Sequence, residues 1–200
     1  NDATWAVTYV DSHDYGPDGQ EKTRYQGGAS AWAENMDLMF TFRGIPCIYY
    51  GSEIEFKKDV PIDVGPNAPL DKTGRAYFGD HLEGSVTASD YGKYTASGTV
   101  ASTLDAPLSK HLEKLNQIRR AVPALQKGQY TTDRNYVSGN MAYIRRYTNS
   151  SEGVDSLACV TISGNATFKG LPNGTYIDAV TGDKKVVTGG TLSTSGVSGK

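Results

Sequence analysis

Cysteine is scarce in this sequence, neither charge is in excess, and long apolar runs are missing. The two cysteines, Cys47 and Cys159, lie in short apolar stretches, where we expect small buried side chains rather than a disulfide or metal ligands. The 20 lysines and arginines are mixed with 22 acidic residues, and no basic patch indicates nucleic-acid binding. No apolar run is long enough to span a bilayer. The composition therefore argues against a disulfide scaffold, a nucleic-acid-binding protein and a membrane-spanning one.

An initiator methionine and a signal peptide are also missing from the beginning of the sequence. Asn1 stands only a few residues before an apolar stretch, which indicates a fragment or a processed chain. The missing leader therefore gives no information on where the parent protein acts. Glycine, by contrast, is abundant at 23 residues, so we expect one large or two small domains with much loop and turn.

The stretch from Thr4 to Val10 is apolar and β-branched, and it ends abruptly in Asp11-Ser12-His13-Asp14. This pattern predicts a buried parallel strand that is covered on both faces and emerges at a functional surface. His13 and Asp14 would then place an imidazole and a carboxylate side by side at the carboxyl end of the strand. The alternative interpretation is a polar turn after a core strand, without a chemical role.

A helix and a second apolar run follow this strand. The spacing of apolar residues predicts a helix from Ser30, as its N-cap, to about Phe42, and Gly44 is expected to end it. Residues 45–50 predict another short strand. Strand, helix and strand make a βαβ unit, whose two parallel strands leave edges and faces that other parts of a fold must cover.

The second half of the sequence changes character twice. Residues 54–104 carry no long periodic segment, and we expect this stretch to lie over the face that bears His13 and Asp14. A helix capped by Asp105 is predicted to reach about Val122. Residues 128–200 show short alternating segments separated by turn signals, which predict a small antiparallel β-sandwich. The expected domains are therefore 1–127 and 128–200.

In this order, the segments resemble parts of the α-amylase family of glycoside hydrolases. Val-Asp-Ser-His-Asp at residues 10–14 resembles the motif on the seventh strand of the family's barrel. Residues 44–53 are similar to its eighth-strand pattern of Gly, any residue, Pro, six residues and Glu. Residues 115–125 look like the end of its last barrel helix. The resemblance implies the C-terminal part of a TIM (β/α)8 barrel, holding strands 7 and 8, the long loop and the last helix, followed by a β-sandwich that is expected to be truncated.

What the resemblance implies chemically is retaining hydrolysis of α-glucans such as starch or maltodextrin by two carboxyl groups. In the family these groups lie on other barrel strands, so the parent's missing N-terminal portion is the expected partner, and the chain alone is expected to be inactive. Asp14 is then the third acidic, catalytic residue, and His13 binds the same sugar. Tyr15 and Tyr25 are candidates for stacking on sugar rings.

Several alternatives stay open at this stage. A related glucanotransferase would use the same residues, and a non-catalytic carbohydrate-binding or scaffold protein could reuse the same fold. Neither metal ligands nor a cofactor is expected in this chain, although calcium is a candidate in the parent enzyme, which the resemblance implies to be secreted and bacterial. Arg75 belongs to a segment with only a loose similarity to the family.

Overall fold

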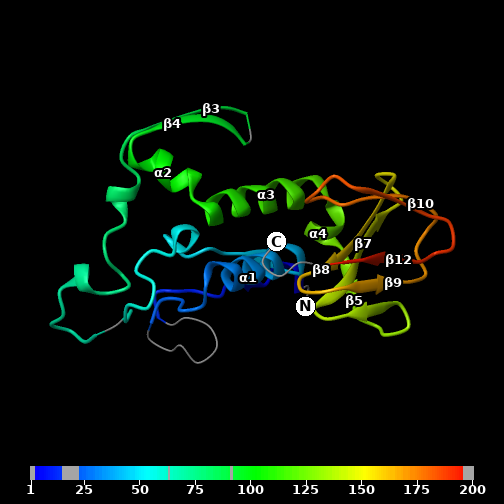
Figure 1. The fold of residues 1–200 in the computed structure, drawn as a ribbon, viewed down its shortest axis with the longest axis horizontal. Helices are drawn as coiled ribbons and strands as arrows, with labels where there is room; N and C mark the ends of the chain where they lie inside the picture. Colours follow the sequence, from blue (N-terminus) through cyan, green and yellow to red (C-terminus); the bar gives the residue numbers. More distant parts are fainter. Residues whose placement is uncertain (1–2, 15–22, 63, 91, 196–200) are drawn as a thin grey trace. The chain divides into compact units, whose positions relative to one another are not determined.

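The computed structural model describes residues 3–14, 23–62, 64–90 and 92–195, and the chain divides into two compact units (Figure 1). The sheet unit comprises Asn1–Ala6, Ala33–Ile45 and Lys114–Lys200, and the loop unit comprises Val7–Trp32 and Pro46–Glu113. Both units are discontinuous in sequence, because two helices begin in one unit and end in the other. This division into units differs from the domain boundary expected at residue 127. The domains 1–127 and 128–200 stay a prediction.

The first strand, β1 (Val7–Thr8), pairs with β2 (Ile45–Pro46). The amide of Ile45 donates to the carbonyl of Ala6 at 2.8 Å, and the amide of Cys47 donates to the carbonyl of Thr8 at 2.8 Å. Because both partners advance together along the chain, the strands are parallel, as the sequence predicted.

Both strands are shorter than predicted, and their burial was predicted wrongly. Ala3–Trp5 form the 3-10 helix η1 rather than the start of a strand. Val7 is 58% exposed, and Cys47 is exposed rather than buried, while both cysteines are free thiols. In the described part of the chain each strand has one strand neighbour, and each has one exposed and one partly buried residue.

Helix α1 (Ala29–Thr41) connects the two parallel strands and confirms the βαβ unit. Its apolar side chains Trp32, Met36 and Phe40 are buried, as their spacing predicted. Ser30 lies within the first turn instead of capping the helix, so that expectation was wrong. Gly44 follows the helix with φ of 92°, a conformation that suits glycine and turns the chain into β2.

The long central segment contains more regular structure than the sequence indicated. It holds η2 (Ser52–Ile54), η3 (Leu70–Lys72), η4 (Gly79–His81), β3 (Ser85–Asp90), β4 (Lys93–Ser97) and α2 (Thr99–Asp105). Strands β3 and β4 form an antiparallel hairpin next to α2 (Figure 1). Asp105 ends α2, so it does not cap the following helix, α3 (Pro107–Ala121).

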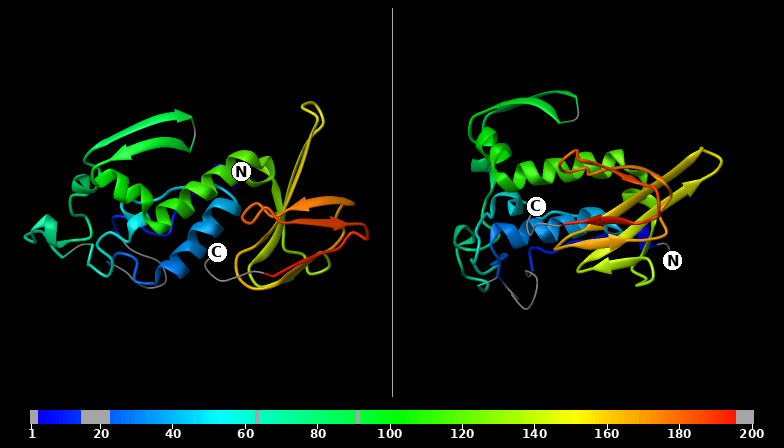
Figure 2. Two further views of the ribbon diagram at one scale, coloured as in Figure 1. Left: turned by 45° about the horizontal axis from the view of Figure 1, so that its top comes forward. Right: turned by 45° about the vertical axis from the view of Figure 1, so that its right-hand side comes forward.

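The remaining elements of the sheet unit are α4 (Pro123–Lys127) and eight strands in antiparallel pairs (Figure 2). The strands are β5 (Gln129–Thr131), β6 (Val137–Gly139), β7 (Ala142–Asn149), β8 (Val154–Thr161), β9 (Ala166–Phe168), β10 (Gly174–Ile177), β11 (Lys184–Val187) and β12 (Leu192–Thr194). They form the sheets β5-β7-β8 and β12-β9-β6 and the hairpin β10-β11. The antiparallel arrangement expected for residues 128–200 is thus confirmed.

Side chains from all three of these sheets share one apolar core. Phe168, which is fully buried in the central strand β9, pairs with Val137 of β6 on one side and with Leu192 of β12 on the other. Ile144 of β7 and Val187 of β11 belong to the same cluster. Burial of this cluster is the main apolar stabilisation of the sheet unit.

Two arginines bind the carbonyl end of α1 within the sheet unit. Arg119 of α3 donates to the carbonyls of Phe40 (2.7 Å) and Gly44 (2.6 Å). Arg145 of β7, which is fully buried, donates to the carbonyls of Thr41 (2.9 Å) and Gly128 (2.8 and 3.1 Å). Burial lowers the pKa of Arg145 from its ordinary value of 12.5 to about 10. Cations at this end complement the helix dipole and satisfy carbonyls that the helix leaves unpaired.

Among the residues that the structure describes, no helix is both long and apolar enough to cross a membrane.

Candidate active site

The residues after β1 form a tight polar turn that ends in His13 and Asp14. The Asp11 carboxylate accepts a hydrogen bond from the amide of Ser12 at 3.1 Å. The Ser12 hydroxyl then accepts one from the amide of Asp14, also at 3.1 Å. Short side chains that bind the backbone one and two residues ahead fix a turn in this way. The orientation of Asp14 therefore follows from the two residues that precede it.

His13 and Asp14 form an exposed pair at this turn. The His13 Nε2 lies 3.2 Å from Asp14 Oδ2, and their side chains are 67% and 59% exposed. Both groups are therefore accessible to a ligand from solvent. A carboxylate accepts hydrogen bonds and an imidazole can donate one, so together they can bind adjacent hydroxyl groups.

Arg75 joins this pair from the long segment after β2. Its Nε donates to the His13 carbonyl at 2.8 Å, and its Nη2 lies 3.4 Å from Asp14 Oδ1. The amide of Arg75 donates to the buried Thr73 hydroxyl at 3.1 Å, which holds the segment beneath the guanidinium. The expectation that the long segment reaches the face of His13 and Asp14 is confirmed at this residue.

Beneath the exposed pair lies a buried ion pair between Arg24 and Asp11. Their side chains are each 2% exposed, and Arg24 Nε donates to Asp11 Oδ2 at 2.9 Å. The Ser52 hydroxyl donates to the same carboxylate oxygen at 3.0 Å. Arg24 also donates to the carbonyls of Gly74 (3.1 Å) and Tyr50 (3.0 Å). A buried charge needs such partners, since its desolvation is otherwise costly.

This buried cluster was not predicted from the sequence. Arg24 stands in a polar loop without periodicity, and Asp11 was expected only to precede the reactive residues. A carboxylate directly after an apolar strand, followed by an arginine in the next loop, is the pattern that could have suggested it.

Of the two tyrosines expected to stack on sugar rings, the structure describes only Tyr25. Tyr15 lies outside the described residues. The Tyr25 ring stacks on Trp32, with 4.5 Å between centroids, and Trp32 in turn donates from Nε1 to the Ser52 carbonyl at 2.8 Å. Tyr25 thus packs beside the buried Arg24 cluster, and a role in binding sugar stays a prediction.

Tyr49 packs against this buried cluster. Its ring lies beneath the Arg24 guanidinium, 4.5 Å from the centroid to Cζ. Burial raises the pKa of Tyr49 well above its ordinary value, and a side-chain hydrogen bond with Tyr50 acts in the same direction. Tyr49 is therefore a neutral ring that packs on the guanidinium rather than an acid or base at physiological pH.

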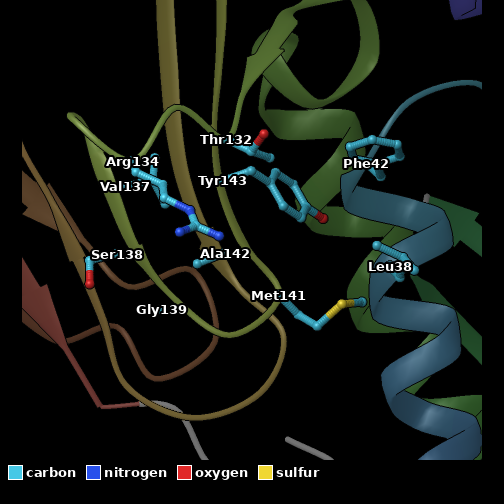
Figure 3. A pocket seen from close by; sticks show the side chains of 10 residues that line it. All are labelled: Leu38, Phe42, Thr132, Arg134, Val137, Ser138, Gly139, Met141, Ala142 and Tyr143. Carbon is cyan, nitrogen blue, oxygen red and sulfur yellow. The ribbon is translucent and has the colours of Figure 1, made fainter.

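A separate cavity of about 720 Å³ lies in the sheet unit and contains none of the expected site residues. It lies against α1 and the β5–β7 region, and Figure 3 shows Met141 extending toward Leu38 of α1. Apolar side chains make up much of the lining, together with Arg134 and Tyr143. Burial raises the pKa of Tyr143 to about 12, so this phenol stays neutral at physiological pH.

Metal ligands were not expected in this chain, and calcium was a candidate only in the parent enzyme. No group of three or more His, Cys, Asp or Glu side chains comes together in the described residues. The Asp71 carboxylate pairs with Lys72 at 3.3 Å, and its carbonyl accepts from Lys57. Calcium in a parent enzyme therefore stays an untested expectation.

Two curated proteins match the chain in sequence, whereas no protein-family model matches it. An α-amylase of Streptomyces lividans is 28% identical over 184 residues, which is 82% of this chain and 19% of that protein. A cyclomaltodextrin glucanotransferase of Paenibacillus macerans is 25% identical over 182 residues, which is 88% of this chain and 20% of that protein. The chain thus spans about a fifth of the length of these relatives.

Solved structures show the same similarity in fold. An Anoxybacillus α-amylase matches 98% of this chain and 37% of its own, with a TM-score of 0.58 and 16% identity. The α-amylase of Geobacillus thermoleovorans, solved with acarbose, matches 96% and 37%, with a TM-score of 0.55 and 16% identity. The resemblance that the motifs at residues 10–14 and 44–53 indicated is therefore confirmed: over most of its length, this chain is similar to proteins of the α-amylase family.

Proposed function

We propose that this chain is the C-terminal part of an α-amylase-type retaining glycoside hydrolase, in which Asp14 and His13 grip the sugar at the scissile bond. The observation that carries the proposal is the exposed His13–Asp14 pair, which follows the first strand of a parallel pair in a chain similar to α-amylases. In α/β barrels, the carboxyl ends of the strands bear the reactive side chains. Strands β1 and β2 are then barrel strands 7 and 8, and residues 128–200 form the C-terminal β-sandwich.

The exposed apolar side chains around β1 support a larger barrel. Trp5 is 76% exposed, Val7 58% and Tyr9 48%. Apolar residues on a parallel strand are normally covered, because such strands lie inside α/β folds. Neighbouring barrel strands in the N-terminal portion of the parent would cover these side chains, and this portion would also supply the nucleophile and the general acid. The chain alone is then inactive.

Asp14 would act by binding the transition state more tightly than the substrate. Its carboxylate would accept hydrogen bonds from the sugar hydroxyls next to the scissile bond, and these bonds strengthen as the ring approaches an oxocarbenium ion. His13 would donate to another hydroxyl of the same sugar. The nearby guanidinium of Arg75 would keep the carboxylate oriented while the sugar binds.

The substrate class that this arrangement favours is an α-glucan such as starch or maltodextrin. The Geobacillus thermoleovorans enzyme in the comparison was solved with acarbose, and both curated relatives bear names of enzymes that act on starch-type glucans. We propose a bacterial parent protein, since the two curated relatives are proteins of Streptomyces lividans and Paenibacillus macerans, and secretion stays an expectation from the family resemblance.

A cyclomaltodextrin glucanotransferase is the second candidate, because one curated relative carries that name. Hydrolases and transferases of this kind would share the role of Asp14. They differ in whether water or a sugar hydroxyl attacks the glycosyl-enzyme intermediate. The product formed from soluble starch, linear sugars or cyclic ones, separates the two.

The proposal is tested first on the chain itself by titrating the 15N-labelled protein with maltoheptaose. We expect the amide signals of residues 12–14 and 75 to shift, and D14N to weaken this response at least about tenfold, as loss of a charge-assisted hydrogen bond would. The same residues failing to respond would contradict a sugar site here. Expression with the coding sequence that precedes the chain, followed by a reducing-end assay on starch, then separates an enzyme from a non-catalytic binding protein.

A further inference from the structure

Arg24 contacts every segment that carries a residue of the exposed site. Its guanidinium binds the Asp11 carboxylate in the turn after β1, the Tyr50 carbonyl after β2, and the Gly74 carbonyl in the long segment. These three partners lie 13, 26 and 50 residues from Arg24 in the sequence. One side chain, 2% exposed, therefore joins four stretches of the chain.

Two of these contacts lie directly beside the site residues. Asp11, which Arg24 fixes, begins the pair of side-chain turns that ends at the amide of Asp14. Gly74, whose carbonyl Arg24 binds, is followed by Arg75, which contacts His13 and Asp14. The buried Arg24 guanidinium thus positions both the Asp14 carboxylate and its cationic neighbour, Arg75.

The geometry requires an arginine and a neighbouring glycine. A planar guanidinium with five donors can reach a carboxylate and two carbonyls at once, whereas a lysine ammonium cannot present this fork. A Cβ atom on Gly74 would lie 2.7 Å from Arg24 Cγ, so a larger residue would displace the side chain. The close approach of Gly74 is therefore part of the same arrangement.

From these contacts we infer that Arg24 is the positioning residue of the site: it acts through Asp11 and Gly74 to hold Asp14 and Arg75 in contact with each other. The inference rests on the proposed function for its consequence in catalysis. Its structural content, that Arg24 sets the Asp14–Arg75 contact, can be measured without any activity.

The experiment uses the 15N-labelled chain and observes the Nε–H signal of Arg75. This group donates to the His13 carbonyl, so its proton should exchange slowly with water in the wild type. We expect R24K to speed this exchange at least about tenfold, because the lysine cannot hold Asp11 and Gly74 together. If R24K does not melt cooperatively, D11N takes its place, since it keeps the side-chain shape and removes one acceptor oxygen.

The matched control is R145K, which also replaces a buried arginine that binds backbone carbonyls, but in the sheet unit. We expect it to lower stability while leaving exchange at Arg75 unchanged. The inference is overturned if the Arg75 Nε–H proton exchanges at the same rate in R24K as in R145K. The same holds for D11N where it replaces R24K.

Titration of each variant with maltoheptaose then separates the inference from the proposed function. Loss of binding in R24K and D14N but not in R145K supports both. A wild type that binds no maltoheptaose, but loses Arg75 protection in R24K, would overturn the proposed function and leave the positioning role standing.

Discussion

Arg145 allows a direct test of whether hydrogen bonds compensate for the desolvation of a buried charge in this protein. Its guanidinium is fully buried and, among the described residues, binds the carbonyls of Thr41 and Gly128. The fall of its pKa from 12.5 to about 10, caused by burial and then by the nearby charge of Arg119, corresponds to ~3 kcal/mol against the charged form, at about 1.4 kcal/mol per pH unit. Hydrogen bonds from a charged group are worth about 1.5–3 kcal/mol each, so bonds to two carbonyls outweigh this cost.

Replacing Arg145 by methionine should therefore be milder than replacing it by lysine. R145M loses both carbonyl partners but also removes the buried charge, so we expect the free energy of unfolding to fall by about 1 kcal/mol. R145K keeps a charge in the same place, and its ammonium can bind only one of the two carbonyls well. We expect a loss of about 2–3 kcal/mol for that variant.

Urea denaturation of the three proteins at pH 7, followed by circular dichroism, measures these differences. The urea midpoints should fall in the order wild type, R145M, R145K. A lysine variant as stable as the wild type, next to a strongly destabilised methionine variant, would refute the reasoning. It would show that charge at the end of α1, rather than the forked geometry, stabilises this region.

Three further predictions concern other parts of the chain. In the complete enzyme, D14A should lower kcat by about a hundredfold or more, the scale of a lost electrostatic group, and a near-normal kcat in a starch assay would contradict the assignment. Burial raises the pKa of Cys159 from 9.0 to about 12, so the unfolded chain releases this proton first, and stability falls as pH rises from about 9 to about 12. Urea midpoints at pH 8, 9 and 10 should show this slope in reduced wild type and a smaller slope in C159A. Asp59 has φ of 66°, which glycine adopts without strain, so D59G should raise the unfolding free energy by about 0.5–1 kcal/mol while D59A should not, as thermal melts of the pair would show.

Local patterns predicted the elements whose signals are local. The spacing of Trp32, Met36 and Phe40 predicted α1, and Gly44 predicted its end. The alternation in residues 157–162 predicted β8. The hairpin β3–β4 escaped prediction because its residues are mostly small, polar and exposed, so no apolar face marks it.

Only part of the candidate site was predicted from the sequence. His13 and Asp14 were expected from their place after a strand, and the structure brings them together. The specific contacts of Arg24 with Asp11 and of Arg75 with His13 were not predicted, because they join residues 13 and 62 positions apart and no local pattern records such pairing. The burial of β1 was overestimated: within the described residues the strand pairs with β2 alone, and Val7 is exposed.

The parallel pair β1–β2 has a consequence for handling the protein. Within the described residues each of these strands pairs with one other strand, and the neighbouring side chains of Trp5 and Val7 are exposed. The edge of a sheet can pair with strands of other molecules, and exposed aromatic side chains favour this association. Concentrated solutions of this chain should therefore form oligomers and precipitate, and a solubilising partner that occupies the edge should prevent it.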